Sequence, residues 1–189
     1  MRLYALCDQD MLDDRGVSLE EYIDIAKHHS AEIIQYRNKN ADIAFIKQQL
    51  IYIRKNFDGF LIVNDAYELI EFCDGVHVGQ EDLKAIDDDI FKAVKILRSV
   101  IKEDKILGIS THNEKEVLEA NEMDVNYIGL GAFRNTSTKK DIVGVLGDSL
   151  DDIASKSKHF VAVIGGVKMD DIFKSVTYHV IGSGLVSKK

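Results

Sequence analysis

Eight short apolar runs, most of them separated by helical patterns, restrict the fold of this chain more than any other feature. The runs are Arg2–Asp8, Ala31–Arg37, Phe60–Asp65, Gly75–Gln80, Ile106–Thr111, Tyr127–Phe133, Phe160–Gly166 and Tyr178–Gly184. Runs of this length, bounded by turn residues, are typical of strands buried on both faces, as in parallel sheets. Eight such strands alternating with helices predict an α/β protein that forms a (β/α)8 barrel, the TIM-barrel fold.

The chain of 189 residues is short for such a barrel, in which roughly 200–250 residues are usual. We therefore expect a single domain over residues 1–189 with shortened helices or loops. Few residues follow Gly184, so the final helix is expected to be missing or reduced to a stub. A second copy of the chain could cover the apolar strip that this would expose, which makes a homodimer one expectation.

Helical signals lie in most of the intervals between the runs. Ser18 and Glu21 form a capping-box signature for a helix that ends near His29, and Asp42 begins a longer helix with an apolar stripe. Further helices are expected at 66–72, 87–102, 114–121 after Asn113, 149–156 and 169–175.

The composition narrows the class of partner and the location. A net charge of −8 argues against nucleic acids and anionic membranes as main partners, because phosphate backbones require a basic surface. No apolar run approaches the roughly 18 residues of a membrane span, and the sequence starts without a signal-peptide pattern. We therefore expect a soluble cytoplasmic protein. Cys7 and Cys73 are too few for a disulfide framework and are expected to be buried reduced thiols.

Polar residues at the carboxyl ends of the predicted strands are the candidates for chemistry, because barrel active sites lie at that face. The second run ends in Gln35, Arg37 and Lys39, whose side chains point the same way if the strand continues. An amide, a guanidinium and an ammonium group suit a phosphate or a pyrophosphate. The alternative is a strand end that runs into a solvated loop.

Acidic residues follow the next two runs. Asn64 and Asp65 end the third run, and Asp82 follows the fourth. Adjacent barrel strands could bring Asp65 and Asp82 face to face, and two carboxylates with substrate phosphate oxygens suit Mg²⁺. Alternatively, Asp65 caps the short helix that begins at Ala66, and Asp82 only opens the next turn.

The fifth run ends in Ser110, which could donate to an anion, and is followed by His112. His112 could serve as an acid or base, or could be a cap-side residue before Asn113. His77 and His179 lie inside apolar runs and are predicted to be core residues with satisfied hydrogen bonds.

The last three strand ends suggest a second anion site. The loop after the sixth run holds Thr136, Thr138 and Lys139, which could close over an anion or form a plain polar loop. Gly166 and Ser183 lie in glycine-containing segments after the seventh and eighth runs, where backbone N–H groups can approach a phosphate. Barrels commonly bind phosphate there. The residues alone predict Mg²⁺-assisted chemistry on phosphorylated small molecules.

The motifs Q-x-R-x-K, V-N-D, H-V-G-Q-E-D, G-I-S-T-H, Y-I-G-L-G, T-x-T-K-K-D and I-G-G-V resemble, in this order, those of the thiamine phosphate synthase family. The resemblance spans Leu3 to Gly184 and extends to the related thiazole tautomerases. The acidic and pyrophosphate-binding positions are degraded in the tautomerases but intact here, which favours a synthase. The resemblance implies a transferase of thiamine biosynthesis. It would couple 4-amino-5-hydroxymethyl-2-methylpyrimidine pyrophosphate with hydroxyethylthiazole phosphate, giving thiamine phosphate and pyrophosphate.

The resemblance also implies a dissociative, Mg²⁺-assisted mechanism and a role for each motif residue. The implied pyrophosphate ligands are Gln35, Arg37, Lys39, Asn64 and Lys139, and the implied Mg²⁺ carboxylates are Asp65 and Asp82. The implied cradle of the thiazole phosphate is Thr136, Thr138, Gly166 and Ser183. Ser110 resembles the serine near the pyrimidine and pyrophosphate, and it joins Arg37 and Lys139 as the implied catalytic residues.

Two departures from the family pattern keep alternatives open. The segment Gly131–Thr136 lacks the proline that the family usually has there, and Ser175–His179 replaces a glycine-rich approach to the last strand. The alternatives are a thiazole tautomerase-like isomerase that uses His112, and a non-catalytic protein that binds a phosphate ligand.

Overall fold

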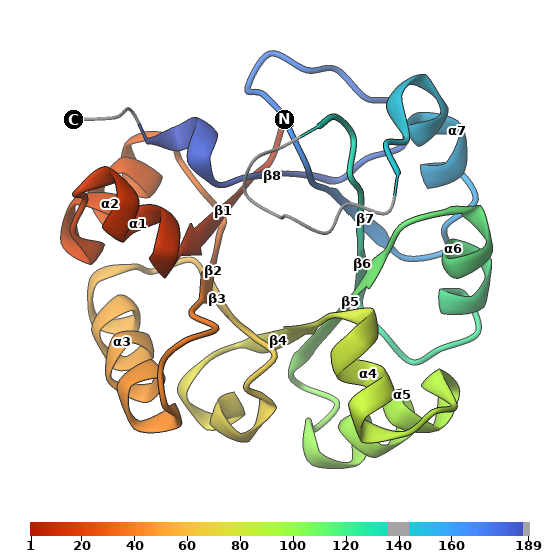
Figure 1. Cartoon of the computed structure of the whole chain (residues 1–189), viewed down its shortest axis with the longest axis horizontal. Coiled ribbons are helices and arrows are strands. Elements are labelled where there is room, and N and C mark those ends of the chain that lie inside the picture. The colour runs from red at the N-terminus through yellow and green to blue at the C-terminus, as the bar shows by residue number, and fades with distance from the viewer. Residues whose placement is uncertain (136–143, 187–189) are drawn as a thin grey trace.

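The eight apolar runs form a closed parallel barrel in which each strand pairs with the next and β8 pairs with β1. Figure 1 shows the ring of strands with the helices outside it in the computed structural model, which describes residues 1–135 and 144–186. The strands are β1 Leu3–Asp8, β2 Ile33–Arg37, β3 Phe60–Asn64, β4 Gly75–Val78, β5 Ile106–Thr111, β6 Tyr127–Leu130, β7 Phe160–Val163 and β8 Tyr178–Ile181. The predicted TIM-barrel fold is confirmed. Several runs extend past their strands, so that their last residues form the loops of the carboxyl-end face.

The helices are shorter than in the sequence prediction, and two of the α-helices were not predicted. The α-helices are α1 Gln9–Arg15, α2 Leu19–His28, α3 Ile43–Asn56, α4 Gln80–Ile86, α5 Ile90–Val100, α6 Glu114–Ala120 and α7 Leu150–Ala154. The 3₁₀ helices are η1 Tyr67–Phe72, η2 Gly147–Ser149 and η3 Ser183–Leu185. The capping box of Ser18 and Glu21 is present as predicted. Within the described residues, only η3 follows β8, in agreement with the expected reduction of the final helix.

The unpredicted helix α1 has recognisable signals at both ends. The Asp8 carboxylate accepts from the N–H of Met11, and Gly16 ends the helix in the left-handed region, with φ of 63°. The second unpredicted helix, α4, begins after Gly79, which has no capping side chain, and so it lacks the signal that marks α1.

The helix predicted for residues 169–175 is wrong, because this segment forms turns. A side-chain carboxylate accepts hydrogen bonds from backbone N–H groups that would pair within a helix. The Asp151 carboxylate accepts from the N–H groups of Lys174 and Ser175, which a helix would direct to carbonyls four residues earlier. Tertiary contacts to carboxylates therefore override the local helical pattern.

Two apolar layers follow from the period-two alternation of the strands. One layer lies between the strands and the helices and holds most of the buried residues. The other fills the barrel and includes Tyr4, Leu6, Ile62, Tyr127 and Val180. Because the interior set includes two tyrosines, the barrel axis carries polar atoms as well as apolar packing.

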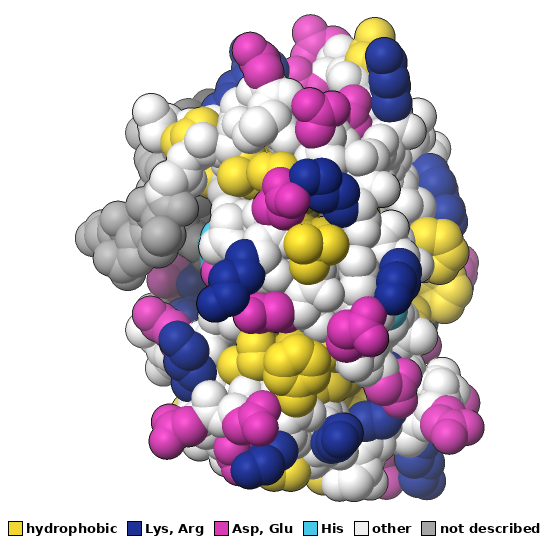
Figure 2. Space-filling model, turned by 90° about the vertical axis from the view of Figure 1, so that its right-hand side faces the viewer, with side chains coloured by type: hydrophobic (Ala, Val, Ile, Leu, Met, Phe, Trp, Pro, Cys, Tyr) yellow, Lys and Arg dark blue, Asp and Glu magenta, His cyan; other side chains and the backbone are white. Residues whose placement is uncertain are grey.

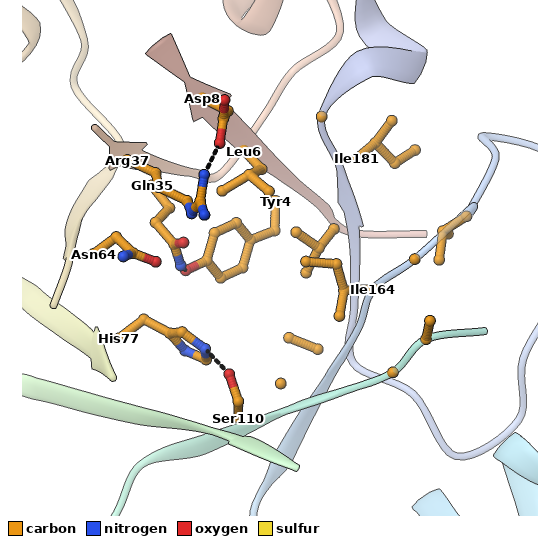
Figure 3. A pocket seen from close by; sticks show the side chains of 18 of the residues that line it. Tyr4, Leu6, Asp8, Gln35, Arg37, Asn64, His77, Ser110, Ile164 and Ile181 are labelled. Atoms are coloured by element: carbon orange, nitrogen blue, oxygen red, sulfur yellow. Dashed lines mark hydrogen bonds and ion pairs between the residues drawn. The ribbon is translucent and has the colours of Figure 1, made fainter. Parts of the chain in front are cut away.

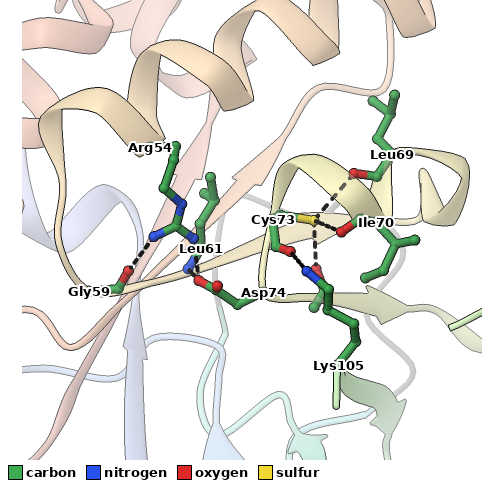
Figure 4. A network of polar contacts seen from close by, with 9 residues as sticks. Arg54, Gly59, Leu61, Leu69, Ile70, Cys73, Asp74 and Lys105 are labelled. Carbon is green, nitrogen blue, oxygen red and sulfur yellow. Dashed lines mark hydrogen bonds and ion pairs between the residues drawn. The ribbon is translucent and has the colours of Figure 1, made fainter. Parts of the chain in front are cut away.

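Polar contacts fix the amino-terminal ends of the strands (Figure 4). The Arg54 guanidinium donates to the carbonyl of Gly59 at 3.1 Å and forms an ion pair with Asp74. The Asp74 carboxylate also accepts from the N–H of Leu61 at 2.7 Å, and Lys105 donates to the carbonyl of Cys73 at 2.6 Å. These contacts join α3 to the starts of β3, β4 and β5, at the face that usually serves stability in barrels.

The state of the two cysteines agrees with the sequence prediction. Cys7 and Cys73 are free and buried, as predicted, and burial raises the pKa of the Cys73 thiol to about 11. On the face shown in Figure 2, acidic and basic side chains are interspersed. No helix in the described part of the chain is long and apolar enough to cross a membrane.

Candidate active site

A cavity of about 340 Å³ lies at the carboxyl ends of the strands and is lined by residues from all around the barrel (Figure 3). Ten of the residues singled out from the sequence line it: Gln35, Arg37, Lys39, Asn64, Asp65, Asp82, Ser110, His112, Gly166 and Ser183. The predicted convergence of Gln35, Arg37 and Lys39 on one side is confirmed, since all three face this cavity. Thr136, Thr138 and Lys139 lie outside the described residues.

Arg37 is held in place by an acidic residue that the sequence analysis did not select. Its guanidinium forms an ion pair with Asp8, at the end of β1, and the two side chains are 16% and 6% exposed. The register of β1 and β2 places these two residues opposite each other. The guanidinium has five N–H donors, so an ion pair with Asp8 leaves others for a ligand. Asp8 therefore orients a cation at the rim of the cavity.

The predicted acidic pair, Asp65 and Asp82, is brought together in the structure. Burial, followed by the charge and hydrogen bond of Asp82, raises the pKa of Asp65, while the Gly79 N–H and the Lys39 charge oppose this rise. The Asp65 carboxylate accepts from the N–H of Gly79 at 3.3 Å, and Asn64 donates to the same carboxylate. Asp65 makes no cap of η1, whereas Asp82 lies in the first turn of α4 and also lines the cavity.

His77 lines the cavity and is only half buried, so its prediction as a core residue is wrong, whereas its predicted hydrogen bonds are made. Its imidazole lies 3.0 Å from the Tyr127 hydroxyl through Nδ1 and 3.0 Å from the Ser110 hydroxyl through Nε2. Gln35 Nε2 donates to the Tyr4 hydroxyl at 2.6 Å, and the Tyr4 and Tyr127 hydroxyls lie 2.8 Å apart. Gln35 thus takes part in a buried polar network at the floor of the cavity.

His179 is buried as predicted, but its hydrogen bonds are not all satisfied. Its Nδ1 has no hydrogen-bond partner among the described residues, and its ring packs edge-on against Phe173 at 5.1 Å. The alternation along β8 turns this side chain away from the cavity. The difference arises because the loop after β7 covers β8 with an aromatic ring instead of a polar group.

His112 fits both roles that the sequence left open. Its backbone N–H donates to Glu116 at 2.8 Å, and its Nδ1 lies 3.0 Å from the same carboxylate oxygen. Burial alone would raise the pKa of Glu116, but the hydrogen bonds from His112 and Asn113 outweigh burial and lower it. His112 therefore belongs to the start of α6 and still lines the cavity.

The far side of the cavity is built from the loops after β6, β7 and β8. Gly166 has a φ of 66°, and a Cβ there would lie 2.8 Å from the Cβ of Arg134, so the close contact of the two loops requires glycine. Arg134 donates to the Gly166 carbonyl at 3.0 Å and to both oxygens of Asp171 at 2.6 and 2.7 Å. Arg15 donates to the carbonyl of Ser183 at 2.7 Å. The side chains of Arg134 and Arg15 thus hold the glycine-containing loops through their carbonyl groups.

The sequence analysis missed several lining residues: Tyr4, Leu6, Asp8, Tyr127, Ile164, Lys168, Val180 and Ile181. Period two along each strand could have found Tyr4, Leu6 and Asp8, because alternate residues of β1 face the interior. Lys168, in the loop after β7, follows no such rule.

The amino-acid sequence is similar to those of thiamine-phosphate synthases over almost its whole length. The model of a family described as thiamine monophosphate synthase matches residues 3–188. The thiamine-phosphate synthase of Persephonella marina is 32% identical, with 93% of this chain and 82% of the relative covered. That of Clostridium acetobutylicum is also 32% identical, with 98% and 85% covered.

Solved structures share the fold. A thiamine phosphate pyrophosphorylase from Pyrococcus furiosus has a TM-score of 0.75 at 24% identity, covering 97% of this chain and 87% of that chain. An N-acetylmannosamine-6-phosphate 2-epimerase from Clostridium perfringens has a TM-score of 0.63 at 12% identity, with the same coverage. The barrel alone does not select an activity, so the family match over residues 3–188 carries the assignment. The chain belongs to the thiamine monophosphate synthase family.

Proposed function

We propose that this protein is a thiamine-phosphate synthase. It is a transferase that couples 4-amino-5-hydroxymethyl-2-methylpyrimidine pyrophosphate with hydroxyethylthiazole phosphate and yields thiamine phosphate and pyrophosphate. One observation carries the proposal: in a member of this family, a single cavity joins a cationic and acidic side at β2–β4 to a glycine-containing side at β7–β8.

The pyrophosphate binds at the β2–β4 side. Arg37 and Lys39 supply positive charge there, Gln35 and Asn64 supply amides, and Ser110 supplies a hydroxyl. A guanidinium oriented by Asp8 suits bidentate recognition of phosphate oxygens. Lys139, whose role we infer from its sequence motif alone, adds a second ammonium group.

Asp65 and Asp82 are the residues that would hold Mg²⁺. Their two carboxylates approach each other at the cavity wall, and the repulsion between them favours a divalent cation. Two carboxylates are a common protein contribution to a Mg²⁺ site, with water and substrate phosphates as further ligands. When bound, the ion neutralises charge that develops on the phosphate oxygens.

The reaction breaks the bond between the pyrimidine methylene carbon and a pyrophosphate oxygen, and the electron pair leaves with the pyrophosphate. The thiazole nitrogen then donates its electron pair to the methylene cation and forms the new carbon–nitrogen bond. Arg37, Lys39, Lys139 and the Ser110 hydroxyl stabilise the departing negative charge. Donors and cations that are already oriented require little reorganisation during this step. No protein nucleophile is needed.

The thiazole phosphate binds at the opposite side of the cavity. Gly166 and Ser183 contribute to its cradle, together with Thr136 and Thr138 as inferred from the sequence motif. Lys168 also lines this side and can balance the charge of a phosphate. The two anions then flank the space in which the new bond forms.

A second candidate is a thiazole tautomerase-like isomerase. The contact of His112 with Glu116 favours it, since a histidine oriented by a carboxylate can transfer a proton. A third candidate is a protein that binds phosphorylated ligands without turnover. A cytoplasmic location, a homodimer and a single domain over residues 1–189 also stay predictions.

One assay separates the three candidates. Purified protein is incubated with both substrates, with and without Mg²⁺, and separately with a thiazole carboxylate phosphate. A synthase forms thiamine phosphate only with Mg²⁺. Turnover of the thiazole carboxylate without metal, abolished in His112→Ala, would establish the isomerase. Calorimetric binding without product would establish the non-catalytic protein.

Variants of the two carboxylates test the proposed Mg²⁺ site separately. Asp65→Ala and Asp82→Ala are each expected to reduce the Mg²⁺-dependent rate by more than about tenfold. Asp88→Ala is the matched control, because this carboxylate is exposed near the end of α4 and outside the cavity. A loss below about tenfold in both Asp65→Ala and Asp82→Ala would refute the metal assignment, even if the protein is a synthase.

A further inference from the structure

A continuous chain of hydrogen bonds crosses the floor of the cavity and ends at Ser110. Gln35 Nε2 donates to the Tyr4 hydroxyl at 2.6 Å, which lies 2.8 Å from the Tyr127 hydroxyl. Tyr127 lies 3.0 Å from His77 Nδ1, and His77 Nε2 lies 3.0 Å from Ser110 Oγ. Figure 3 shows Gln35 beside Tyr4 and the contact of His77 with Ser110. The five residues come from five different strands.

Two glycines leave room inside the barrel for this chain of hydrogen bonds. A Cβ at Gly108 would overlap the ring of Tyr127, and a Cβ at Gly129 would lie 2.9 Å from His77 Cε1. Both glycines face the barrel interior at positions where a side chain would displace a member of the chain. The backbone of Ser110 is fixed as well, because Gln80 donates to its carbonyl at 2.6 Å.

With the Gln35 amide as the donor to Tyr4, one direction along these hydrogen bonds gives every hydroxyl hydrogen an acceptor. Because Tyr4 accepts from Gln35, its own hydrogen is free to go to Tyr127, whose hydrogen then goes to His77 Nδ1. A neutral imidazole that accepts at Nδ1 carries its hydrogen at Nε2. In this direction, the His77 hydrogen goes to Ser110 Oγ at 3.0 Å, which leaves the serine hydrogen for a group in the cavity.

Both tyrosines remain protonated donors at physiological pH. Burial raises the pKa of Tyr4 and of Tyr127 well above the ordinary value for tyrosine, and the Gln35 amide only partly offsets burial. The side chains are almost fully buried, with 1% of Tyr4 and 7% of Tyr127 exposed. Bulk water therefore has little access to these two hydroxyl groups and does not readily reverse the direction of the hydrogen bonds.

We propose that Tyr4, Tyr127 and His77 are positioning residues that hold Ser110 as a hydrogen-bond donor toward an anionic oxygen in the cavity. A free serine hydroxyl donates and accepts with similar ease, whereas a phosphate oxygen without a proton only accepts. If the hydroxyl hydrogen already points toward the anion, the hydroxyl group does not have to reorient during binding and reaction. The inference rests on the proposed function only in taking the anion to be the pyrophosphate group.

The first test measures the His77 tautomer in the ligand-free protein. Histidine labelled with ¹⁵N is observed by long-range ¹H–¹⁵N NMR at pH 8, and His77→Gln assigns the signal. We expect Nε2 to be protonated and Nδ1 to be unprotonated. A hydrogen on Nδ1 would mean that Ser110 donates into the chain, and averaging of the two tautomers would mean that no direction is fixed. Either result overturns the proposal.

The second test asks whether Tyr127 acts through Ser110. Tyr127→Phe is expected to lower kcat/KM by about 3- to 10-fold in the native background, the range of one hydrogen bond. In a Ser110→Ala background it should change kcat/KM by less than about twofold. An equal loss in both backgrounds would show that Tyr127 acts independently of Ser110. If Tyr127→Phe does not fold, Tyr4→Phe takes its place.

Tyr178→Phe is the matched control. This tyrosine also lies beside Tyr4, with ring centroids 6.4 Å apart, but its hydroxyl interacts with Glu32 and takes no part in the chain. It should leave both the His77 tautomer and kcat/KM unchanged. If the protein does not couple the two substrates, the tautomer measurement still decides the proposal. The affinity for inorganic pyrophosphate, measured by calorimetry, then replaces kcat/KM in the same set of variants.

Discussion

Replacing Asp8 with asparagine is expected to lower the thermal stability of the protein without removing helix α1. Asp8 has two roles: its carboxylate accepts from the N–H of Met11 at the start of α1, and it pairs with Arg37. Asparagine keeps an oxygen for the first role and loses the charge required for the second. Because both side chains are largely buried, the change leaves Arg37 without its counter-charge.

The expected loss of stability in Asp8→Asn follows from this burial. Removing one partner of a buried ion pair costs up to roughly 3–5 kcal/mol, and the 16% exposure of Arg37 reduces this to about 2–3 kcal/mol. For a chain of 189 residues, about 1 kcal/mol shifts Tm by roughly 2–4 °C, so Asp8→Asn should lower Tm by roughly 4–12 °C. Asp8→Ala also removes the cap and should cost about 1 kcal/mol more.

Circular dichroism melts of the two variants test this reasoning. Glu32→Gln is the control, because the pair of Glu32 with Arg2 is exposed, and its loss should cost less than about 1 kcal/mol. A Tm within about 1 °C of the native protein for Asp8→Asn would refute the stabilising role of the pair. Equal melting of Asp8→Asn and Asp8→Ala would refute the capping role.

Three further outcomes are expected. Burial and then the N-terminal amino group lower the pKa of His179, while Asp171 opposes them. The unfolded chain therefore binds the proton more readily, and stability should fall as pH drops below about 6.5. Urea midpoints at pH 8 and 5.5 should show this loss in the native protein and a smaller loss in His179→Phe. Gly129→Ala should displace His77 and cost about 1–3 kcal/mol in urea unfolding, with a lower coupling rate; unchanged values would contradict the close contact. Arg134→Ala should raise the KM for the thiazole phosphate but change Tm by less than about 4 °C, since Arg134 is half exposed. An unchanged KM would show that the tie between the two loops does not shape the site.

The strand pattern and the composition of the strand ends could be predicted from the sequence. Residues buried on both faces of a parallel strand must be apolar, so the eight runs marked the barrel directly. Period two then placed Gln35 and Arg37 on one side of the cavity, because successive side chains of a strand alternate, whereas Lys39 lines the cavity from the bend after β2. Ser18 and Glu21 marked the start of α2, because a capping box involves only nearby residues.

The sequence by itself thus determined the barrel, the face that carries the cavity and ten of the residues that line it. Only the tertiary structure decided which polar groups pair with each other. Tyr4 and Tyr127 are 123 residues apart, and Asp8 and Arg37 are 29 apart, so no local pattern relates them. Tertiary contacts likewise gave Asp151 the backbone N–H groups that a helix at 169–175 would have used. Spacing along one chain is a local property, whereas the partner of a buried donor depends on where barrel closure places every strand.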